Sequence, residues 1–263
     1  MKNKLQAFLD DKVVRFNQPD FITDDPIQIP HQFERLQDRE IMGFWVSILA
    51  WGQRKTIIRN ALRLIELMGG QPYEFIVQHR EEDRARFADF KHRTFQYTDT
   101  LYFLAFLQWY YRQHDSLEDA FARFIRPEHE HIGPALRGFH ELFFHLPDAP
   151  QRTRKHIATP ARNSSCKRLN MFLRWMVRQD DCGVDFGDWQ RIRPAQLLMP
   201  LDVHVERIAR RLGLITRTQR DWKTVLELTA NLRRYDPVDP VKYDFALFGL
   251  GVLEKETGNQ VEF

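Results

Sequence analysis

The sequence predicts an all-α protein. Apolar residues recur every three to four positions in nearly every long segment, which is the period of a helix with one buried face. No segment of any length alternates apolar and polar residues as a half-buried strand does. The chain has only 12 glycines and 13 prolines, few for an all-β protein, and its 43% of hydrophobic residues are enough for a substantial core.

The first half of the chain is expected to form short and medium helices separated by breaks. Gly52 ends the second of them directly after an apolar run, and Gly69-Gly70 ends the third. Ser116 is a candidate N-cap for the fifth. Helices are predicted over residues 5–16, 33–51, 53–67, 98–111, 120–125 and 132–146.

In the second half, helix starts are marked by capping residues. Ser164 or Ser165 can cap a helix that runs to about Gln179, and Asp202 can cap the next one. Asp239 followed by proline is typical of a cap with proline in the first turn. Helices are predicted over residues 165–179, 202–213, 222–234 and from 239 onward, after a loop at 147–165.

The charge of the chain is modest but unevenly distributed. A formal net charge of +3 excludes a globally polycationic protein, so nucleic-acid binding would need basic residues gathered on one face. Residues 151–170 contain six lysines and arginines and no acidic residue. The stretch indicates either a nucleic-acid contact or a solvated loop.

Two cysteines, Cys166 and Cys182, are too few for an iron–sulfur cluster held by four thiolates or for a structural zinc site built on cysteine. They do not indicate a disulfide scaffold, so a reducing cytoplasm is expected. We expect no signal peptide behind the N-terminus, and no membrane span, because no run of about eighteen apolar residues occurs.

Lys167 is a candidate nucleophile. It stands at a predicted helix start beside Arg168, and both the helix dipole and the neighbouring cation oppose the ammonium form. Partial burial under a ligand would act in the same direction. A neutral amine can attack a sugar carbon. The alternative is a surface lysine on a basic helix.

Asp202 is the second candidate catalytic group. Before Val203-His204-Val205 it is a good N-cap, which is the plain structural explanation. A capping carboxylate is also held in a fixed position, where it can activate an amine and face a developing cation. The two roles are compatible.

Two segments resemble the helix-hairpin-helix DNA glycosylases. Pro200-Leu201-Asp202-Val203-His204-Val205-Glu206-Arg207, followed by Arg211-Leu212-Gly213, is similar to the "VDTHVxRV…RLGL" segment of that superfamily, where the aspartate is catalytic. Ile48-Leu49-Ala50-Trp51-Gly52-Gln53 is similar to the "ILSxQ" segment of the endonuclease III branch, whose glutamine starts a helix and probes the base stack. The resemblance covers about two thirds of the chain and implies catalytic Lys167 and Asp202.

The chain departs from the endonuclease III branch before its aspartate. That branch has a glycine-rich hairpin, "GVGRKTA", where this chain has 159–168 without a glycine, and 35 residues separate Lys167 from Asp202. The archaeal 8-oxoguanine glycosylase branch also has an altered hairpin and a long gap. The chain looks closest to a bacterial family of uncharacterised function related to that branch, through segments 165–178 and 244–251.

The resemblance also implies binding residues. A flipped base is held against flat side chains, and the candidates are Trp51, Trp175 and Trp189, each of which is otherwise a core residue. His204 is equally explained as a structural hydrogen-bonding residue. The candidate DNA contacts are Gln53, Arg162, Ser165, Arg168, Arg174 and His204.

The resemblance finally implies the organisation and activity. One subdomain is expected at about 30–160 and a second from 1–29 plus 161–263, with double-stranded DNA in a cleft between them. The implied activity of this monomeric, nucleoid-associated protein is excision of an oxidised purine such as 8-oxoguanine with strand cleavage. No cofactor is implied, although hairpin carbonyls bind a monovalent cation in this superfamily. The alternatives are a non-catalytic nucleic-acid-binding module of the same fold and a helical protein–protein scaffold.

Overall fold

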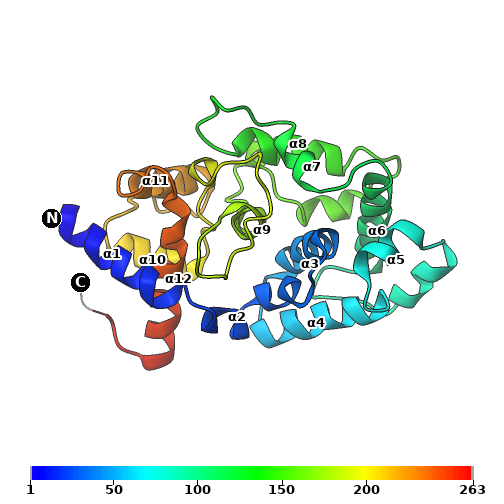
Figure 1. Cartoon of the computed structure of the whole chain (residues 1–263), viewed down its shortest axis with the longest axis horizontal. Coiled ribbons are helices and arrows are strands. Elements are labelled where there is room, and N and C mark those ends of the chain that lie inside the picture. Colours follow the sequence, from blue (N-terminus) through cyan, green and yellow to red (C-terminus); the bar gives the residue numbers. More distant parts are fainter. Residues whose placement is uncertain (1, 262–263) are drawn as a thin grey trace. The chain divides into compact units, whose positions relative to one another are not determined.

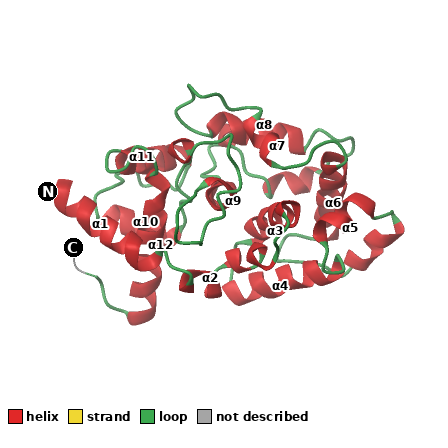
Figure 2. Ribbon diagram, viewed as in Figure 1, coloured by secondary structure: helices red, strands yellow, loops and turns green. Residues whose placement is uncertain are grey.

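The computed structural model describes residues 2–261. Within that range most of the chain is helical and the rest forms loops and turns. That part of the chain contains no β-strand, only an isolated bridge between His92 and Phe95 (Figure 2). The prediction of an all-α protein is confirmed. The chain divides into two compact units. The first unit comprises Met1–Thr23, Pro127–Gly133 and Thr159–Phe263, and the second unit comprises Asp24–Arg126 and Pro134–Ala158.

The second unit is built around two buried helices. Every residue of α3 from Glu40 to Leu49 is buried, and α6 buries most of its length. Phe44 of α3 stacks on Phe103 of α6 with ring centroids 5.6 Å apart, and Phe103 meets Phe143 edge-on at 4.9 Å. The helices are α3 (Leu36–Leu49), α4 (Arg54–Leu67), α5 (Pro72–Gln78), α6 (Tyr97–Tyr111), α7 (Glu118–Ala122) and α8 (Gly133–Phe143).

The first unit contains both ends of the described chain. Helix α1 lies along α12, and α12 also packs against α10 (Figure 1). Two glycines of α12 allow these close approaches. A Cβ on Gly249 would lie 2.4 Å from the Phe16 ring, and a Cβ on Gly251 would lie 2.6 Å from Cβ of His204. The helices are α1 (Lys2–Phe16), α9 (Lys167–Val177), α10 (Val203–Arg211), α11 (Trp222–Arg233) and α12 (Tyr243–Thr257). The short helix α2 (Asp20–Asp24) crosses the boundary to the second unit.

Several predicted boundaries needed correction. Helix α5 was not predicted, because its seven residues are too short to show a periodicity. The cap of α9 is Cys166 rather than a serine, and the helix ends at Val177. Asp239 does not cap the last helix with its side chain. It precedes a 3-10 turn at Pro240–Lys242, and α12 begins at Tyr243.

Other predicted starts and stops are confirmed. Helix α9 begins at Lys167, and Asp202 caps α10 through its side chain. Gly213 follows α10 with a φ of 68°, the left-handed conformation that favours glycine after a helix end. Between residues 2 and 261, no helix is both long and apolar enough to cross a membrane.

Candidate active site

Lys167 occupies the first position of α9, after a turn with two left-handed residues. Asn163 has a φ of 54° and Cys166 a φ of 50°. Asparagine adopts this conformation readily, whereas cysteine rarely does. The Cys166 N–H donates to Oγ of Ser164 at 3.3 Å, and its buried thiol donates to the Ser164 carbonyl at 3.4 Å. The turn therefore sets where α9 begins, and it places the half-buried Lys167 in the first turn of that helix.

Asp202 is fixed by the backbone of α10. Its Oδ1 accepts hydrogen bonds from the N–H groups of His204 at 2.8 Å and Val205 at 3.0 Å. Both bonds use the same oxygen, so Oδ2 does not take part in capping the helix. The carboxylate is half-buried, and its position is set by the helix rather than by a flexible side-chain contact.

Asp244 connects these two residues electrostatically. It lies in the first turn of α12 and is 5% exposed. Burial raises the pKa of the Asp244 carboxyl to about 6, and the charge of Asp202 raises it too, whereas Arg174 and Lys167 lower it. The charges of Lys167 and Asp202 thus both reach Asp244, and each of the three residues stands at the N-terminal end of its helix.

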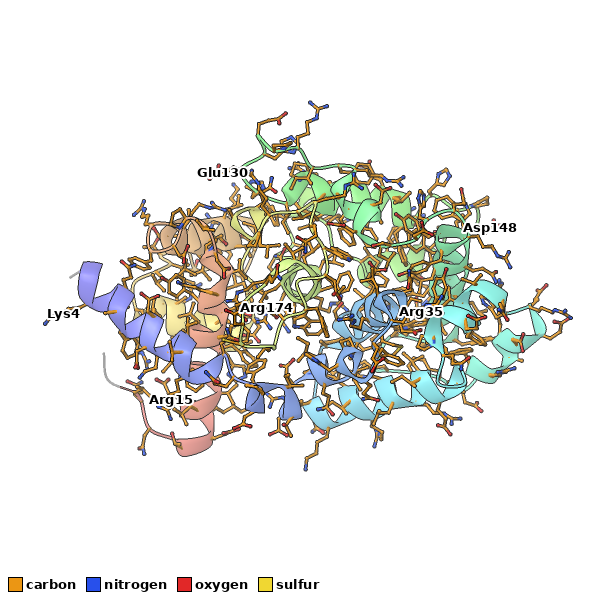
Figure 3. All side chains as sticks on the ribbon, viewed as in Figure 1. Lys4, Arg15, Arg35, Glu130, Asp148 and Arg174 are labelled. Atoms are coloured by element: carbon orange, nitrogen blue, oxygen red, sulfur yellow. The ribbon has the colours of Figure 1, made fainter. Side chains whose placement is uncertain are left out.

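Arg174 holds the carboxyl of Asp244 in place. Its Nη1 donates to Oδ2 of Asp244, and its Nε donates to Oδ1 of Asp185 at 3.2 Å. The guanidinium also lies 4.5 Å from the centroid of the Phe245 ring. Arg174 is only 3% exposed, in contrast to Lys4 and Arg15 of α1, which project outward (Figure 3).

This burial corrects the prediction that Arg174 contacts DNA. A guanidinium enclosed by two carboxylates and an aromatic ring is not available to a phosphate. Arg178, one turn further along the chain, continues the network. It pairs with Asp180 at 2.7 Å, with Asp185 at 3.2 Å and with Asp239 at 2.9 Å. Buried aspartates and arginines thus join α9 to the start of α12.

Two of the three predicted stacking tryptophans belong to the core. Trp175 is fully buried, and its indole N–H has no hydrogen-bond partner among the described residues. Trp189 is 2% exposed and meets Phe172 edge-on at 5.3 Å. Neither ring offers a face to a base. The prediction of stacking by Trp175 and Trp189 is therefore wrong. The sequence locates neither the buried face of α9, which carries Trp175, nor the packing of the irregular segment that carries Trp189.

Trp51 lies in the second unit and is partly exposed. Arg93, with a φ of 56°, covers it at 4.7 Å from the ring centroid, and Gly52 has a φ of 111°. The Trp51 carbonyl accepts from Nε2 of His92 at 3.2 Å. Gln53 caps α4 through its backbone, and its exposed side chain makes no hydrogen bond within residues 2–261. Trp51 and Gln53 thus stay candidates for contact with a nucleic acid.

The remaining predicted DNA contacts differ in accessibility. Arg162 is exposed on a 3-10 turn at Pro160–Arg162, and Ser165 is half-buried just before Lys167. Burial lowers the pKa of the Arg168 guanidinium to about 10, which leaves it charged at neutral pH. Nδ1 of His204 lies 3.1 Å from the Gly251 carbonyl, so this ring nitrogen serves the packing of α10 on α12.

The basic stretch at 151–170 is divided between the two units. Its first part belongs to the second unit and its second part to the first unit. Arg152 pairs with the buried Asp99 at 3.2 Å, and the Arg154 guanidinium lies 4.7 Å from the centroid of the Phe144 ring. These two side chains have intramolecular roles. Arg162, Lys167 and Arg168 are the basic residues of the stretch that flank the candidate site.

Sequence analysis did not identify Asp244 or Asp185 as site residues. Asp244 opens a segment that the resemblance had already singled out, residues 244–251, but its partner Arg174 is 70 positions away in the chain. Asp185 lies in an irregular segment without a periodic signal. Among residues 2–261, no group of three or more histidine, cysteine, aspartate or glutamate side chains is arranged to hold a metal ion.

Comparison with known proteins identifies a family without naming an activity. No curated protein and no solved structure matches the chain. The model of one family, described as a protein of unknown function (DUF2400), matches residues 25–253. This match includes α3 to α11, most of α12, and all of Lys167, Asp202 and Asp244. The chain therefore belongs to the DUF2400 family.

Proposed function

We propose that this protein is a DNA glycosylase with associated lyase activity, in which Lys167 is the nucleophile and Asp202 the activating carboxylate. One observation carries the proposal. Lys167 and Asp202 stand at the N-termini of two different helices of the first unit and both act electrostatically on the buried Asp244. An amine and a fixed carboxylate are the pair needed to attack a sugar carbon, and the resemblance assigns these roles to Lys167 and Asp202.

The proposed reaction begins with Nζ of Lys167 as a neutral amine. It attacks C1′ of the damaged nucleotide, the N-glycosidic bond breaks, and the base leaves with the bonding electron pair. The Asp202 carboxylate is held on the α10 backbone, where it opposes the positive charge that develops on the sugar. The resulting Schiff base between Lys167 and the opened sugar permits β-elimination of the 3′ phosphate, which cuts the strand.

The substrate proposed is double-stranded DNA with an oxidised purine of the 8-oxoguanine type. This choice rests on the resemblance to the archaeal 8-oxoguanine glycosylase branch, through the altered hairpin at 159–168 and the long gap from Lys167 to Asp202. Base excision requires a flat side chain and a probe of the stack. Trp51 and Gln53 are the candidates that remain accessible. Arg162, exposed on the 3-10 turn that precedes α9, supplies positive charge for the phosphate backbone.

Borohydride trapping tests this function. The full-length protein is incubated with a duplex carrying 8-oxoguanine or an abasic site, in the presence of borohydride, and separated on a denaturing gel. A covalent complex is expected with the wild type and none with Lys167→Gln. DNA binding that weakens with salt, without trapping on either duplex, would favour a non-catalytic nucleic-acid-binding module. Absence of DNA binding at low salt would favour a protein–protein scaffold.

A further inference from the structure

Helix α4 of the second unit carries a stripe of positive charge. Lys55, Arg59 and Arg63 follow one another at intervals of four residues, so their side chains lie on one face of the helix, and all three are exposed. Residues 50–65 contain no acidic residue. Arg63 pairs with Glu66 at 2.6 Å, whereas in the described part of the chain the side chains of Lys55 and Arg59 make no ion pair. Like charges at this spacing repel and weaken a helix, so folding does not account for the stripe.

A two-residue hairpin turn extends this positive charge beyond the helix. His92 and Phe95 exchange two backbone hydrogen bonds of 2.9 Å, and Arg93 is the first of the two residues at the tip. Lys91 and Arg93 are both exposed. One exposed acid, Asp89, precedes the hairpin, so the net charge of this loop stays positive.

The buried ring of His92 fixes the hairpin against α4. Its Nε2 donates to the Trp51 carbonyl at 3.2 Å, and its Nδ1 lies 2.8 Å from the side-chain nitrogen of Asn60. The same Asn60 nitrogen lies 3.4 Å from the Lys91 carbonyl. Asn60 directly follows Arg59 in α4, so the cations of the hairpin and of the helix belong to one surface. We call this the basic surface, and its residues are Lys55, Arg59, Lys91 and Arg93.

Arg93 occupies a backbone conformation that does not suit it. Its φ is 56° at the first position of a two-residue hairpin loop, where a positive φ favours glycine. Its guanidinium lies 4.7 Å from the centroid of the Trp51 ring. A Cβ on Gly52 would lie 2.9 Å from Nη1 of Arg93, so Gly52 leaves room for the guanidinium. An arginine kept at a glycine position indicates that its side chain has a use there.

We propose that the second unit binds the backbone of a nucleic acid through the basic surface, independently of the chemistry at Lys167. Cations without an intramolecular partner give affinity for a polyanion by releasing its counterions. The groups beside them favour a nucleic acid. Trp51 is a partly exposed flat ring, and Gln53 is an exposed amide that can both donate and accept hydrogen bonds. Such groups stack on bases or hydrogen-bond to them, next to cations that hold the phosphates.

An anionic membrane is the other polyanion that a basic helix can bind, and α4 does not suit it. A helix that lies in a membrane surface embeds a face of large apolar side chains. The apolar face of α4 is buried within the protein, at Ile57, Ala61, Leu64 and Leu67. Leu62, 45% exposed, is the one strongly exposed apolar side chain of this helix. Phosphates of a nucleic acid therefore fit this surface better than a bilayer does.

The salt dependence of DNA binding tests the basic surface. The full chain is titrated into an undamaged, fluorescently labelled duplex at several salt concentrations, and affinity is measured by fluorescence anisotropy. Each phosphate contact contributes about 0.9 to the slope of log affinity against log salt. Lys55→Gln/Arg59→Gln should therefore reduce the slope by about two and lower the affinity about tenfold.

Arg80→Gln/Arg137→Gln is the matched control. It removes the same charge from two exposed side chains of the same unit, one after α5 and one on α8. The control should leave the salt slope close to that of the wild type. An equal loss of slope in the two double variants, or no loss in Lys55→Gln/Arg59→Gln, would overturn the proposal.

Arg93→Asn separates binding from a purely structural role of Arg93. Asparagine adopts a positive φ more readily than arginine does, so the hairpin should be retained and the melting temperature should not fall. The salt slope should fall by about one, because one phosphate contact is lost. A lower melting temperature with an unchanged slope would show that Arg93 serves only to cover Trp51 and would contradict the proposal.

These measurements also keep the basic surface separate from the proposed catalysis. Lys167→Gln should retain the affinity and salt slope of the wild type, because the basic surface lies in the other unit. The expected loss of slope in a protein that traps no abasic duplex would support the basic surface and refute the nucleophilic role of Lys167. Normal trapping with an unchanged slope in Lys55→Gln/Arg59→Gln would overturn the basic surface alone. Binding to phosphatidylserine vesicles without binding to DNA would overturn it in favour of a membrane.

Discussion

Arg174 donates a hydrogen bond from Nη1 to Oδ2 of Asp244, and both side chains are buried in the first unit. This ion pair joins the helix that begins with Lys167 to the helix that begins at Tyr243. Both charged groups lost their hydration when they were buried, so the attraction between them is largely offset by that cost, and removing one partner would leave the other buried without a counter-charge. The pair therefore fixes α9 relative to the start of α12, and its disruption should lower the unfolding free energy substantially.

Arg174→Met should destabilise the protein strongly. The substitution leaves Asp244 without its cation and removes one partner of Asp185, so about 3–5 kcal/mol of unfolding free energy should be lost. Urea denaturation measures the loss. Arg207→Met is the control. Arg207 also pairs with a carboxylate, that of Glu254, but the Arg207 side chain is 45% exposed, so its removal should lower the unfolding free energy by about 1 kcal/mol or less. Equal effects of the two substitutions would contradict a structural role for Arg174.

Asp202→Asn should separate the helix-capping role of Asp202 from its proposed catalytic role. Asparagine caps helices about as well as aspartate, so the unfolding free energy should change little, whereas Asp202→Ala should lower it by about 1 kcal/mol. Both variants should slow covalent trapping by about a hundredfold or more, because both lack the carboxylate charge. The two variants are compared by urea denaturation and by single-turnover trapping. Full activity of Asp202→Asn would show that Asp202 is only a cap.

Asp244 should make stability depend on pH with a definite sign. Its folded-state pKa of about 6 lies above the ordinary value of 3.8, so the folded state binds its proton more tightly than the unfolded state does. The stabilisation from this group is complete below about pH 3.8 and is lost as the pH rises through about 6. The unfolding free energy of the wild type minus that of Asp244→Asn should fall by about 2 kcal/mol between pH 4 and pH 7. A difference that stays constant or rises would contradict the assignment.

Gly251→Ala should affect both stability and activity. The new Cβ would lie 2.6 Å from Cβ of His204, so α10 must move away from α12, and Asp202 moves with it. Overpacking of this kind typically costs about 1–3 kcal/mol. Gly249→Ala is a matched control, because its Cβ would meet the Phe16 ring on α1 instead. The two variants should lose similar amounts of stability in thermal melts, but only Gly251→Ala should slow trapping strongly.

The sequence predicted those features of the fold that neighbouring residues determine. The all-α class follows from the period of the apolar residues, and the starts of α9 and α10 follow from a basic helix start and an aspartate cap. The left-handed conformation of Cys166 could not be predicted, because cysteine has no preference for it.

Only some residues of the candidate site could be predicted, because the contacts that determine which side chains face inward join residues far apart in the chain. Arg174 has partners 11 and 70 residues away, and those partners determine that it faces inward rather than toward solvent. The same rotation of α9 buries Trp175 completely. Periodicity indicates that a helix has a buried face, but the neighbours that cover each residue are set by tertiary packing.

Identification of the residue that bonds to DNA tests the proposed chemistry most directly. The complex trapped with borohydride on an abasic duplex is digested with protease and nuclease, and the modified peptide is sequenced by mass spectrometry. The adduct is expected on Nζ of Lys167, with no other lysine modified in the wild type. An adduct on a different lysine or on the N-terminal amine, with Lys167 unmodified, would contradict the assignment of Lys167 as the nucleophile.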